Sequence, residues 1–516
     1  MSREDKSLSR RGKREPGPPD DTGTRRQHRR GADMNETDVL IVGAGLSGIG
    51  AAYRLQQERP RDRYAILEQR EALGGTWDLF RYPGVRSDSD MFTLSYPFRP
   101  WRGEKSMADG ESIRTYIGDT AREAGIDRHI HYGTTVQGAS WSSEDARWTV
   151  TTSRGTWTCR FLYLCAGYYS YERGHQPDFP GLADYAGTVV HPQAWPEDLD
   201  HTGKRVVVIG SGATAVTLIP AMAETAAHVT MLQRSPSYLT ALPLKDKFAD
   251  TLRRRLPAGL AHRVVRAKNI AVTQGFYQLA RRRPEVVKKV LRGIALRFLD
   301  EKAVDEHFTP RYEPWDQRLC VIPGGDFYQA IRDGSASVVT DHVERFTEKG
   351  ILLRSGRELE ADVVVSATGL RMLPLGGLEI AVDGASVDLG DTFSYRGLML
   401  SGVPNLAYCI GYTNASWTLR ADLSSRYVCR LLNHMEKHGY AAAAPTAPAS
   451  AERRPLLDLT SGYVQRSIDA FPSQGTTEPW RVQQNYVADA LKMSRADLSR
   501  DMRFTPTTAR SLQEAS

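Results

Sequence analysis

The sequence has few cysteines and no long apolar segment. Its five cysteines are scattered among 516 residues, without a CxxC pair and without the spacing of a zinc site. This scarcity argues against a disulfide framework, a metal site and a dithiol redox centre, and it predicts a reducing, cytoplasmic setting. The longest apolar runs, VLIVGAG and VVVIGSG, have the length of strands. No run approaches the ~18 residues that a transmembrane helix needs.

The first 33 residues lack the large apolar side chains that a packed core requires. They are charged and contain several Pro and Gly residues, which predicts a disordered basic tail over residues 1–33. The SRRGK segment resembles a twin-arginine signal, but no apolar stretch follows it, so no export is predicted. The tail contributes much of the formal net charge of +7. We therefore infer no nucleic-acid binding from that charge.

A glycine-rich turn follows the first apolar run, in DVLIVGAGLSGIGAAYRL. Gly43, Gly45 and Gly48 form a GxGxxG pattern. The first glycine permits a tight turn, the second lets the backbone approach a pyrophosphate, and the third lets the helix pack on the strand. The next predicted strand, YAIL, ends at Glu68, whose carboxylate can accept hydrogen bonds from both hydroxyls of a ribose. The pattern predicts a dinucleotide site for an unphosphorylated ribose.

A second glycine-rich turn lies in KRVVVIGSGATAVTLIP. Gly210, Gly212 and Ala215 form the GxGxxA variant, and the strand that follows leads to Arg234 and Ser235, with no acid at the ribose position. A carboxylate there would repel a 2′-phosphate, whereas an Arg can bind one with two hydrogen bonds. The second site is therefore predicted to prefer NADPH to NADH.

Two different dinucleotide sites on one chain indicate FAD plus NADPH, and hence a flavin-dependent redox enzyme. The predicted fold is α/β, with two Rossmann-like dinucleotide-binding domains and a helical insert. The FAD domain is expected in two parts, residues 34–180 and residues 377–516, the latter with the C-terminal segment. The NADPH domain is expected over residues 181–376, with the insert at about 241–309.

The loop after the first site carries GGTWDLFRYPGVRSD. Gly74 and Gly75 allow close backbone approach to a cofactor, Trp77 and Tyr82 offer flat apolar surfaces, and Asp88 ends the stretch as a carboxylate. On spacing alone, the loop is equally a structural one in which Asp88 caps a turn.

This loop and several later segments resemble the type I Baeyer–Villiger monooxygenases. GGTWDLFRYPGVRSD matches their GGxWxxxx(F/Y)PGxxxD motif, and YAGTVVHPQAWP is similar to their FxGxxxHxxxWP fingerprint, with Tyr for the first Phe. ADVVVSATGL resembles the ATG segment that leads back to the flavin domain. CVIPGGDF, GVPNLAYCIGYTNASWTL and SGYVQRSIDAFP look closest to the ethionamide-activating branch. The resemblance covers roughly residues 36 to 495.

The resemblance implies insertion of one oxygen atom of O2 beside a ketone carbonyl, through a flavin C4a-peroxide, to give an ester or lactone. Sulfides or thioamides are further expected substrates. Arg318, in PWDQRLCVIP, stands where the family places its catalytic Arg, and Asp88 would hold it. An Arg suits this task because its guanidinium stays charged. On the residues alone, Arg318 is equally a structural partner of Asp316 or Glu313.

The resemblance also implies further residue sets. The flavin site would use Gly43, Gly45, Ser47, Gly48, Glu68, Thr76, Trp77, Asp88 and, through its backbone, Val136. The nicotinamide site would use Arg86, Ser87, Asp88, Gly210, Ser211, Gly212, Ala213, Thr214, Ala215, Arg234, Ser235, Gln317 and Arg318. Asn414 and Trp417 are expected near the cofactors. The fingerprint residues, which would guide domain movement rather than chemistry, are Tyr185, Gly187, His191, Trp195 and Pro196.

Gln317 departs from many relatives, which carry Lys beside the NADPH phosphate. Loss of that cation predicts weaker discrimination against NADH and leaves Arg234 to hold the preference alone.

Residues 245–302 alternate basic and apolar side chains at roughly helical spacing, with few acids. Such helices can lie on anionic membranes, which would give peripheral membrane contact. The alternative, which we favour, is the solvated basic face of a helical subdomain that covers the active site.

Other functions fit part of the pattern. A flavin-containing N- or S-hydroxylating monooxygenase shares the two turns, but the GGxW motif and Arg318 favour oxygen insertion into ketones. A disulfide reductase is disfavoured because CxxC is missing. A non-catalytic flavin-bound sensor or membrane-docking protein would not consume NADPH continuously when given a ketone. The sequence predicts neither the physiological substrate nor the oligomeric state.

Overall fold

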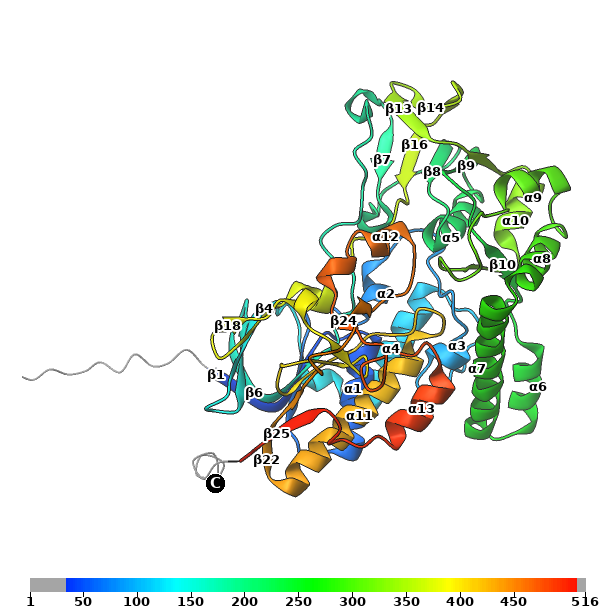
Figure 1. Cartoon of the computed structure of the whole chain (residues 1–516). Coiled ribbons are helices and arrows are strands. Elements are labelled where there is room, and N and C mark those ends of the chain that lie inside the picture. The colour runs from blue at the N-terminus through cyan, green and yellow to red at the C-terminus, as the bar shows by residue number, and fades with distance from the viewer. Residues whose placement is uncertain (1–33, 508–516) are drawn as a thin grey trace, which may run out of the picture.

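The computed structural model describes residues 34–507, and its two largest sheets are a mixed nine-stranded sheet and a parallel five-stranded sheet (Figure 1). The predicted tail over residues 1–33 lies outside the described residues. The first sheet has the order β18-β17-β4-β5-β6-β1-β2-β3, with β21 beside β6. Its strands are β1 Met34–Val42, β2 Tyr64–Leu67, β3 Ile130–His131, β4 Val136–Ser142, β5 Arg147–Thr152, β6 Gly155–Leu164, β17 Glu379–Val382, β18 Ala385–Ser386 and β21 Leu406–Tyr408.

The core of the first sheet follows from a continuous apolar run. β1 lies between β2 and β6 and pairs with both in parallel. Val39, Leu40 and Ile41 are buried on both faces of the sheet. Such burial requires apolar residues at successive positions rather than at alternate ones. Helix α1 (Leu46–Glu58) packs against the long helix α11 (Trp417–His438), so segments from opposite ends of the chain form one layer.

The second sheet is five-stranded and wholly parallel, in the order β12-β9-β8-β16-β7. Its strands are β7 Thr188–Val190, β8 Arg205–Ile209, β9 His228–Gln233, β12 Ala336–Thr340 and β16 Val363–Ser366. The first strand of the motif, β8, is central, and helix α5 (Ala213–Met222) follows it. This is the strand order of half a Rossmann fold. The predicted α/β class with two Rossmann-like units is confirmed.

The chain enters the second sheet at β7 and returns to the first at β17, which pairs with β4. The proposed domain bounds, 34–180, 181–376 and 377–516, remain predictions. The other strands are β10 Leu239–Leu242, β11 Cys320–Pro323, β13 Val343–Thr347, β14 Gly350–Leu353, β15 Glu358–Glu360, β19 Ser394–Tyr395, β20 Met399–Leu400, β22 Tyr440–Pro445, β23 Arg454–Pro455, β24 Ser473–Gln474 and β25 Met502–Pro506. The other helices outside the insert are α2 Thr76–Leu79, α3 Met91–Leu94, α4 Gly110–Glu123, α10 Asp326–Arg332, α12 Gly462–Gln465 and α13 Tyr486–Ser494.

Between β10 and β11 the chain forms the helical insert, which lies to one side of both sheets in Figure 1. Its helices are α6 Lys247–Arg255, α7 Ala258–Arg282, α8 Pro284–Ala295 and α9 Glu301–His307. Local capping sets their limits: Asp246 accepts from the first-turn amides of α6, Pro284 begins α8, and Asp300 caps α9. Within residues 34–507, no helix is both long and apolar enough to cross a bilayer.

A buried arginine docks the insert on the first unit. Nη1 of Arg266, on α7, donates to the carbonyl oxygens of Phe92, Thr93 and Ser95 at 2.8, 3.1 and 2.8 Å. These carbonyls lie at the end of the short helix α3, where intrahelical donors are missing. Arg266 thus supplies from another element the hydrogen bonds that the helix end lacks.

We expect Arg266→Ala to destabilise the protein by about 3 kcal/mol, because three buried carbonyls lose their donor. The measurement is thermal unfolding together with limited proteolysis of the insert. Arg263→Ala is the control, since Arg263 is exposed on the same helix and has no polar partner among the described residues. Equal thermal stability and protease resistance of the two variants would contradict this docking role.

Candidate functional site

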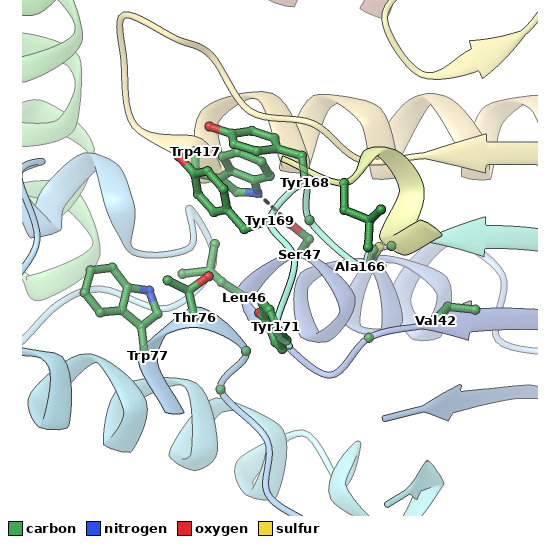
Figure 2. A pocket seen from close by; sticks show the side chains of 18 of the residues that line it. Val42, Leu46, Ser47, Thr76, Trp77, Ala166, Tyr168, Tyr169, Tyr171 and Trp417 are labelled. Atoms are coloured by element: carbon green, nitrogen blue, oxygen red, sulfur yellow. Dashed lines mark hydrogen bonds between the residues drawn. The ribbon is translucent and has the colours of Figure 1, made fainter. Parts of the chain in front are cut away.

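A cavity of about 470 Å³ opens at the carboxyl ends of the first sheet's strands (Figure 2). Parallel sheets bind ligands at this edge. Predicted site residues that line it are Gly43, Gly45, Ser47, Glu68, Thr76, Trp77, Ser87, Asp88, Val136, Arg318 and Trp417. They come from segments far apart in the chain, and the fold brings them to one place.

The floor of this cavity is bare backbone. Gly43 has a φ of +104°, and a Cβ on it would lie 2.7 Å from the carbonyl oxygen of Cys165. A Cβ on Gly48 would lie 1.9 Å from the carbonyl oxygen of Gly43, so only glycine lets α1 approach β1 this closely. The loop at Gly74 and Gly75 touches the glycine turn at the start of α1, because a Cβ on Gly75 would lie 3.1 Å from the Cα of Gly45.

The amino end of α1 is free to bind an anion. Gly45 occupies the N-cap position and provides no side-chain cap, and the first turn contains no acid. The first amides of a helix lack intrahelical partners and attract phosphate. With the close-packed glycines, this end of α1 has the shape and the donors that the pyrophosphate of FAD requires.

Glu68 lies at the end of β2 and is nearly inaccessible to solvent. Its Oε2 accepts from the Ala44 amide at 2.8 Å, and its Oε1 accepts from the Arg70 amide at 2.9 Å. Burial raises the pKa of this carboxyl, and the two backbone donors lower it. Each carboxylate oxygen can accept a further hydrogen bond, and the side chain lines the cavity, as a ribose-binding acid should.

Arg318 and Asp88 meet at the cavity although 230 residues separate them. Nη2 of Arg318 lies 3.2 Å from Oδ2 of Asp88, and each side chain is about one-third exposed, at 34% and 30%. The carboxylate of Asp88 is the main cause that raises the pKa of the Arg318 guanidinium. Neither Asp316 nor Glu313 is the ion-pair partner, because Arg281 binds Asp316 and Lys288 binds Glu313. Arg318 thus remains a fixed cation at the cavity.

Aromatic side chains form another part of the wall. Tyr168, Tyr169 and Trp417 gather on one side in Figure 2, and the ring centroids of Tyr168 and Trp417 are 5.1 Å apart. Trp417 Nε1 donates to Ser47 Oγ at 2.7 Å, which links α11 to the glycine turn. Sequence reasoning did not single out Tyr168 or Tyr169. Their position directly after the buried strand β6, at the ligand-binding edge, was the signal that could have found them.

Some expected residues lie elsewhere. Tyr82 packs in the core of the second unit, with residues of α5, rather than in the cavity. Arg86 pairs with Asp326, with Nη2 to Oδ1 at 3.2 Å, and does not line the cavity. Asn414 donates through Nδ2 to the carbonyl of Gln484 at 2.9 Å and also lies outside the lining. Gln317 lies next to Arg318 but does not reach the cavity.

The second glycine turn is open to solvent. Gly210 has a φ of +136°, and a Cβ there would lie 2.3 Å from the Ala367 carbonyl oxygen, whereas a Cβ on Gly212 would meet nothing within 4 Å. Gly212, Ala213, Arg234 and Ser235 are exposed. Helix α5 has neither a side-chain cap nor an acid in its first turn. Ser211 and Thr214 flank this free helix end, and Ala215 is buried beneath it.

The fingerprint residues surround the junction of β7 and β16 and lie outside the cavity lining. Tyr185 Oη donates to the Ala361 carbonyl at 2.9 Å, and a Cβ on Gly187 would lie 2.3 Å from that Oη. His191 Nδ1 accepts from the Gln193 amide at 3.1 Å, and burial lowers the pKa of His191. Trp195 packs on the core of the second unit. These contacts are structural, and the role in domain movement stays a prediction.

All five cysteines are buried and free. Within residues 34–507, no group of three or more His, Cys, Asp and Glu side chains is placed to hold a metal.

Comparisons with known proteins show which family and which relatives this chain is similar to. The sequence model of a family described as pyridine nucleotide-disulphide oxidoreductase matches residues 40–274. The FAD-containing monooxygenase EthA of Mycobacterium tuberculosis (strain ATCC 25618 / H37Rv) is 51% identical over 480 residues, 92% of this chain and 98% of EthA. EthA of Mycolicibacterium smegmatis (strain ATCC 700084 / mc(2)155) is 52% identical over 467 residues, 89% of this chain and 95% of that protein.

Solved structures share the fold. The structure of an oxidised steroid monooxygenase bound to NADP matches with a TM-score of 0.72 and 23% sequence identity. The match covers 92% of this chain and 100% of that chain. The open form of cyclohexanone monooxygenase gives a TM-score of 0.71 at 21% identity, over 91% of this chain and 100% of that chain. The identity and coverage of the EthA relatives show that the chain belongs to the family of FAD-containing monooxygenases.

Proposed function

We propose that the protein is an FAD- and NADPH-dependent Baeyer–Villiger monooxygenase, which inserts one oxygen atom of O2 beside a ketone carbonyl to give an ester or lactone. The observation that carries this proposal is the Arg318–Asp88 pair at the cavity that fits FAD. The fold shared with steroid and cyclohexanone monooxygenases supports it.

FAD would lie in the cavity, with its pyrophosphate at the amino end of α1 and its ribose at Glu68. The bound flavin supplies the redox chemistry that activates O2 with electrons from NADPH. The chain's own contribution is to hold the reacting atoms, exclude water and stabilise charge. The aromatic side chains of Tyr168, Tyr169 and Trp417 keep one side of the cavity apolar, which favours a ketone over water.

Arg318 would stabilise the negative charge that develops on the oxygen atoms during attack on the carbonyl. Because Asp88 raises the pKa of the guanidinium, Arg318 stays protonated and acts as a fixed charge rather than a proton donor. Asp88 holds the guanidinium in place through the ion pair. Among the described residues that line the cavity, Arg318 carries the one positive charge.

NADPH would bind at the second glycine turn, with its pyrophosphate at the amino end of α5 and its 2′-phosphate at Arg234. Arg234 directly follows β9, the position at which Rossmann folds distinguish the two coenzymes, and it is exposed. In this arrangement the open turn suits a coenzyme that enters and leaves in each cycle.

Sulfides and thioamides are further proposed substrates, and N- or S-hydroxylation is the alternative activity. A fixed cation that does not exchange protons favours attack on a carbonyl, whereas sulfur oxidation requires an electrophilic, protonated oxygen. The geometry at Arg318 therefore favours ketones.

We also propose that the insert attaches the protein to anionic lipid surfaces, in place of the solvated basic face that the sequence favoured, because its helices expose large apolar side chains. Of the exposed large apolar side chains, those on or beside the insert are Leu242, Leu244, Phe248, Leu260, Val264, Val272, Leu279, Val286, Val290 and Leu296. Val272 is 62% exposed. On α7 the helical spacing places Leu260, Val264, Val272 and Leu279 on one side of the helix.

Basic side chains accompany this apolar surface. Among those that are exposed and have no acidic partner in the part of the chain that the structure describes are Arg254, Arg255, Arg263, Arg282, Arg283 and Lys289. A stripe of apolar residues edged by free cations matches the charge and polarity of an anionic bilayer surface. The other exposed large apolar residues, Val487 and Leu491, lie on α13 outside the insert.

We expect Arg318→Ala to lower ester formation from a ketone at least ~100-fold while NADPH oxidation continues, because the stabilising charge is lost but the dinucleotide sites remain. Product analysis and NADPH consumption are measured together. Arg311→Ala, a change at an exposed position on the same segment, is the control. Ester formed at an undiminished rate by Arg318→Ala would refute the assigned role.

We expect Arg234→Ala to raise the KM for NADPH ~10-fold or more and to leave the KM for NADH nearly unchanged, because a charge-assisted contact to the 2′-phosphate is lost. Steady-state kinetics with each coenzyme measure the ratio. An equal increase for both coenzymes would show that Arg234 does not read the 2′-phosphate.

We expect the protein to bind vesicles that contain anionic lipid and to lose ~10-fold or more affinity in the double variant Val264→Asp/Val272→Asp. Val487→Asp/Leu491→Asp is the matched control, with exposed apolar residues replaced outside the insert. Cosedimentation with anionic and with neutral vesicles measures the affinity. Absent binding to anionic vesicles, or an equal loss in both variants, would exclude this surface.

A further inference from the structure

Three strand ends of the second sheet meet around the open glycine turn. β8 ends at Ile209, next to Leu232 of β9 and Ser366 of β16. The chain therefore places Gly210 between Arg234, which follows β9, and the segment that follows β16. Gly210 and the segment that follows β16 approach each other closely, since a Cβ on Gly210 would lie 2.3 Å from the Ala367 carbonyl oxygen.

Helix α12, from the SGYVQRS segment, covers the end of this β16 segment. A Cβ built on Gly369 would lie 3.8 Å from Arg466 Nη2 and 3.8 Å from Tyr463 Cβ. The chain just before α12 is fixed near Arg318 by Thr460. The Thr460 amide donates to the Asp316 carbonyl oxygen at 2.8 Å, and Thr460 Oγ1 donates to the same oxygen at 3.0 Å. The C-terminal part of the chain thus runs from the cavity's cation towards the second glycine turn.

Arg466 and Arg234 lie on either side of the Gly210 turn, because Arg234 follows β9 and Arg466 lies beside the segment that follows β16. Both side chains are exposed, and neither has an acidic partner among the described residues. Burial and then the positive charge of Arg234 lower the pKa of the Arg466 guanidinium, so the two cations lie near enough to repel each other. Arg466 also contributes to the lowered pKa of His175, after the larger effect of burial. An anion between the two guanidinium groups would relieve this repulsion.

We propose that Arg466 is a second ligand of the 2′-phosphate of NADPH and shares it with Arg234. This inference rests on the proposed use of NADPH at the second glycine turn. It also accounts for the neutral Gln317: the second cation of the site comes from α12 rather than from the residue before Arg318. A 2′-phosphate carries close to two negative charges at neutral pH, and two planar guanidinium groups can each donate two hydrogen bonds to it.

The test compares Arg466→Gln with the wild-type holoenzyme. We expect kcat/KM for NADPH to fall ~10–100-fold and kcat/KM for NADH to stay within about 2-fold, because only the contact to the 2′-phosphate is lost. Arg466→Lys keeps the charge and should recover part of the loss. Arg481→Gln is the control, since Arg481 is exposed and its side chain has no partner among the described residues.

A direct binding measurement tests the role of Arg466 separately from the proposed NADPH site. Calorimetry with 2′,5′-ADP and with 5′-AMP reports the 2′-phosphate contact without any turnover. Preference of the wild type for 2′,5′-ADP, lost in Arg466→Gln, supports the assignment. Preference retained in Arg466→Gln, or an equal loss of affinity for both probes, overturns Arg466 alone. A wild type that binds both probes equally overturns Arg466 and the NADPH site together.

Discussion

The ion pair between Arg318 and Asp88 joins the two nucleotide-binding units at the cavity where they meet. Asp88 belongs to the loop before α3 of the first unit, and Arg318 lies two residues before β11, after the insert. Because both side chains are partly exposed, the pair adds little to the free energy of unfolding. Its effect is positional: it holds one guanidinium at a cavity in which no other described lining residue is positively charged. The Arg86–Asp326 pair crosses the same boundary beside it.

The two glycine turns use one backbone design in different surroundings. At the first, Gly45 touches Gly75, and Glu68 and an aromatic wall partly enclose the cavity. At the second, space around Gly212 is empty and the neighbouring cations are exposed. An enclosed site retains a ligand through many cycles, whereas an open one releases it in each cycle. This contrast suits a resident flavin and an exchangeable NADPH.

Local sequence patterns predicted the parts of this site that depend on the backbone. The glycine spacings determined both turns, and Glu68 followed from the length of one strand-helix-strand unit. The Arg318–Asp88 pair required the family resemblance, because no spacing connects residues 230 positions apart. Tyr168 and Tyr169 were missed although they follow a buried strand at the ligand-binding edge, and Arg466 was missed because its position depends on how α12 packs. Tyr82 was predicted to offer a flat apolar surface, and that ring packs in the core of the second unit, where a large ring gains most free energy.

We propose that the fixed cation at the cavity directs one oxygen atom of O2 into a carbonyl substrate. The most direct test supplies the FAD-loaded protein with NADPH, a ketone panel and ¹⁸O2, followed by mass spectrometry of the products. We expect an ester or lactone that carries one ¹⁸O atom. NADPH consumption that yields only hydrogen peroxide, with no labelled product from any ketone, would contradict it.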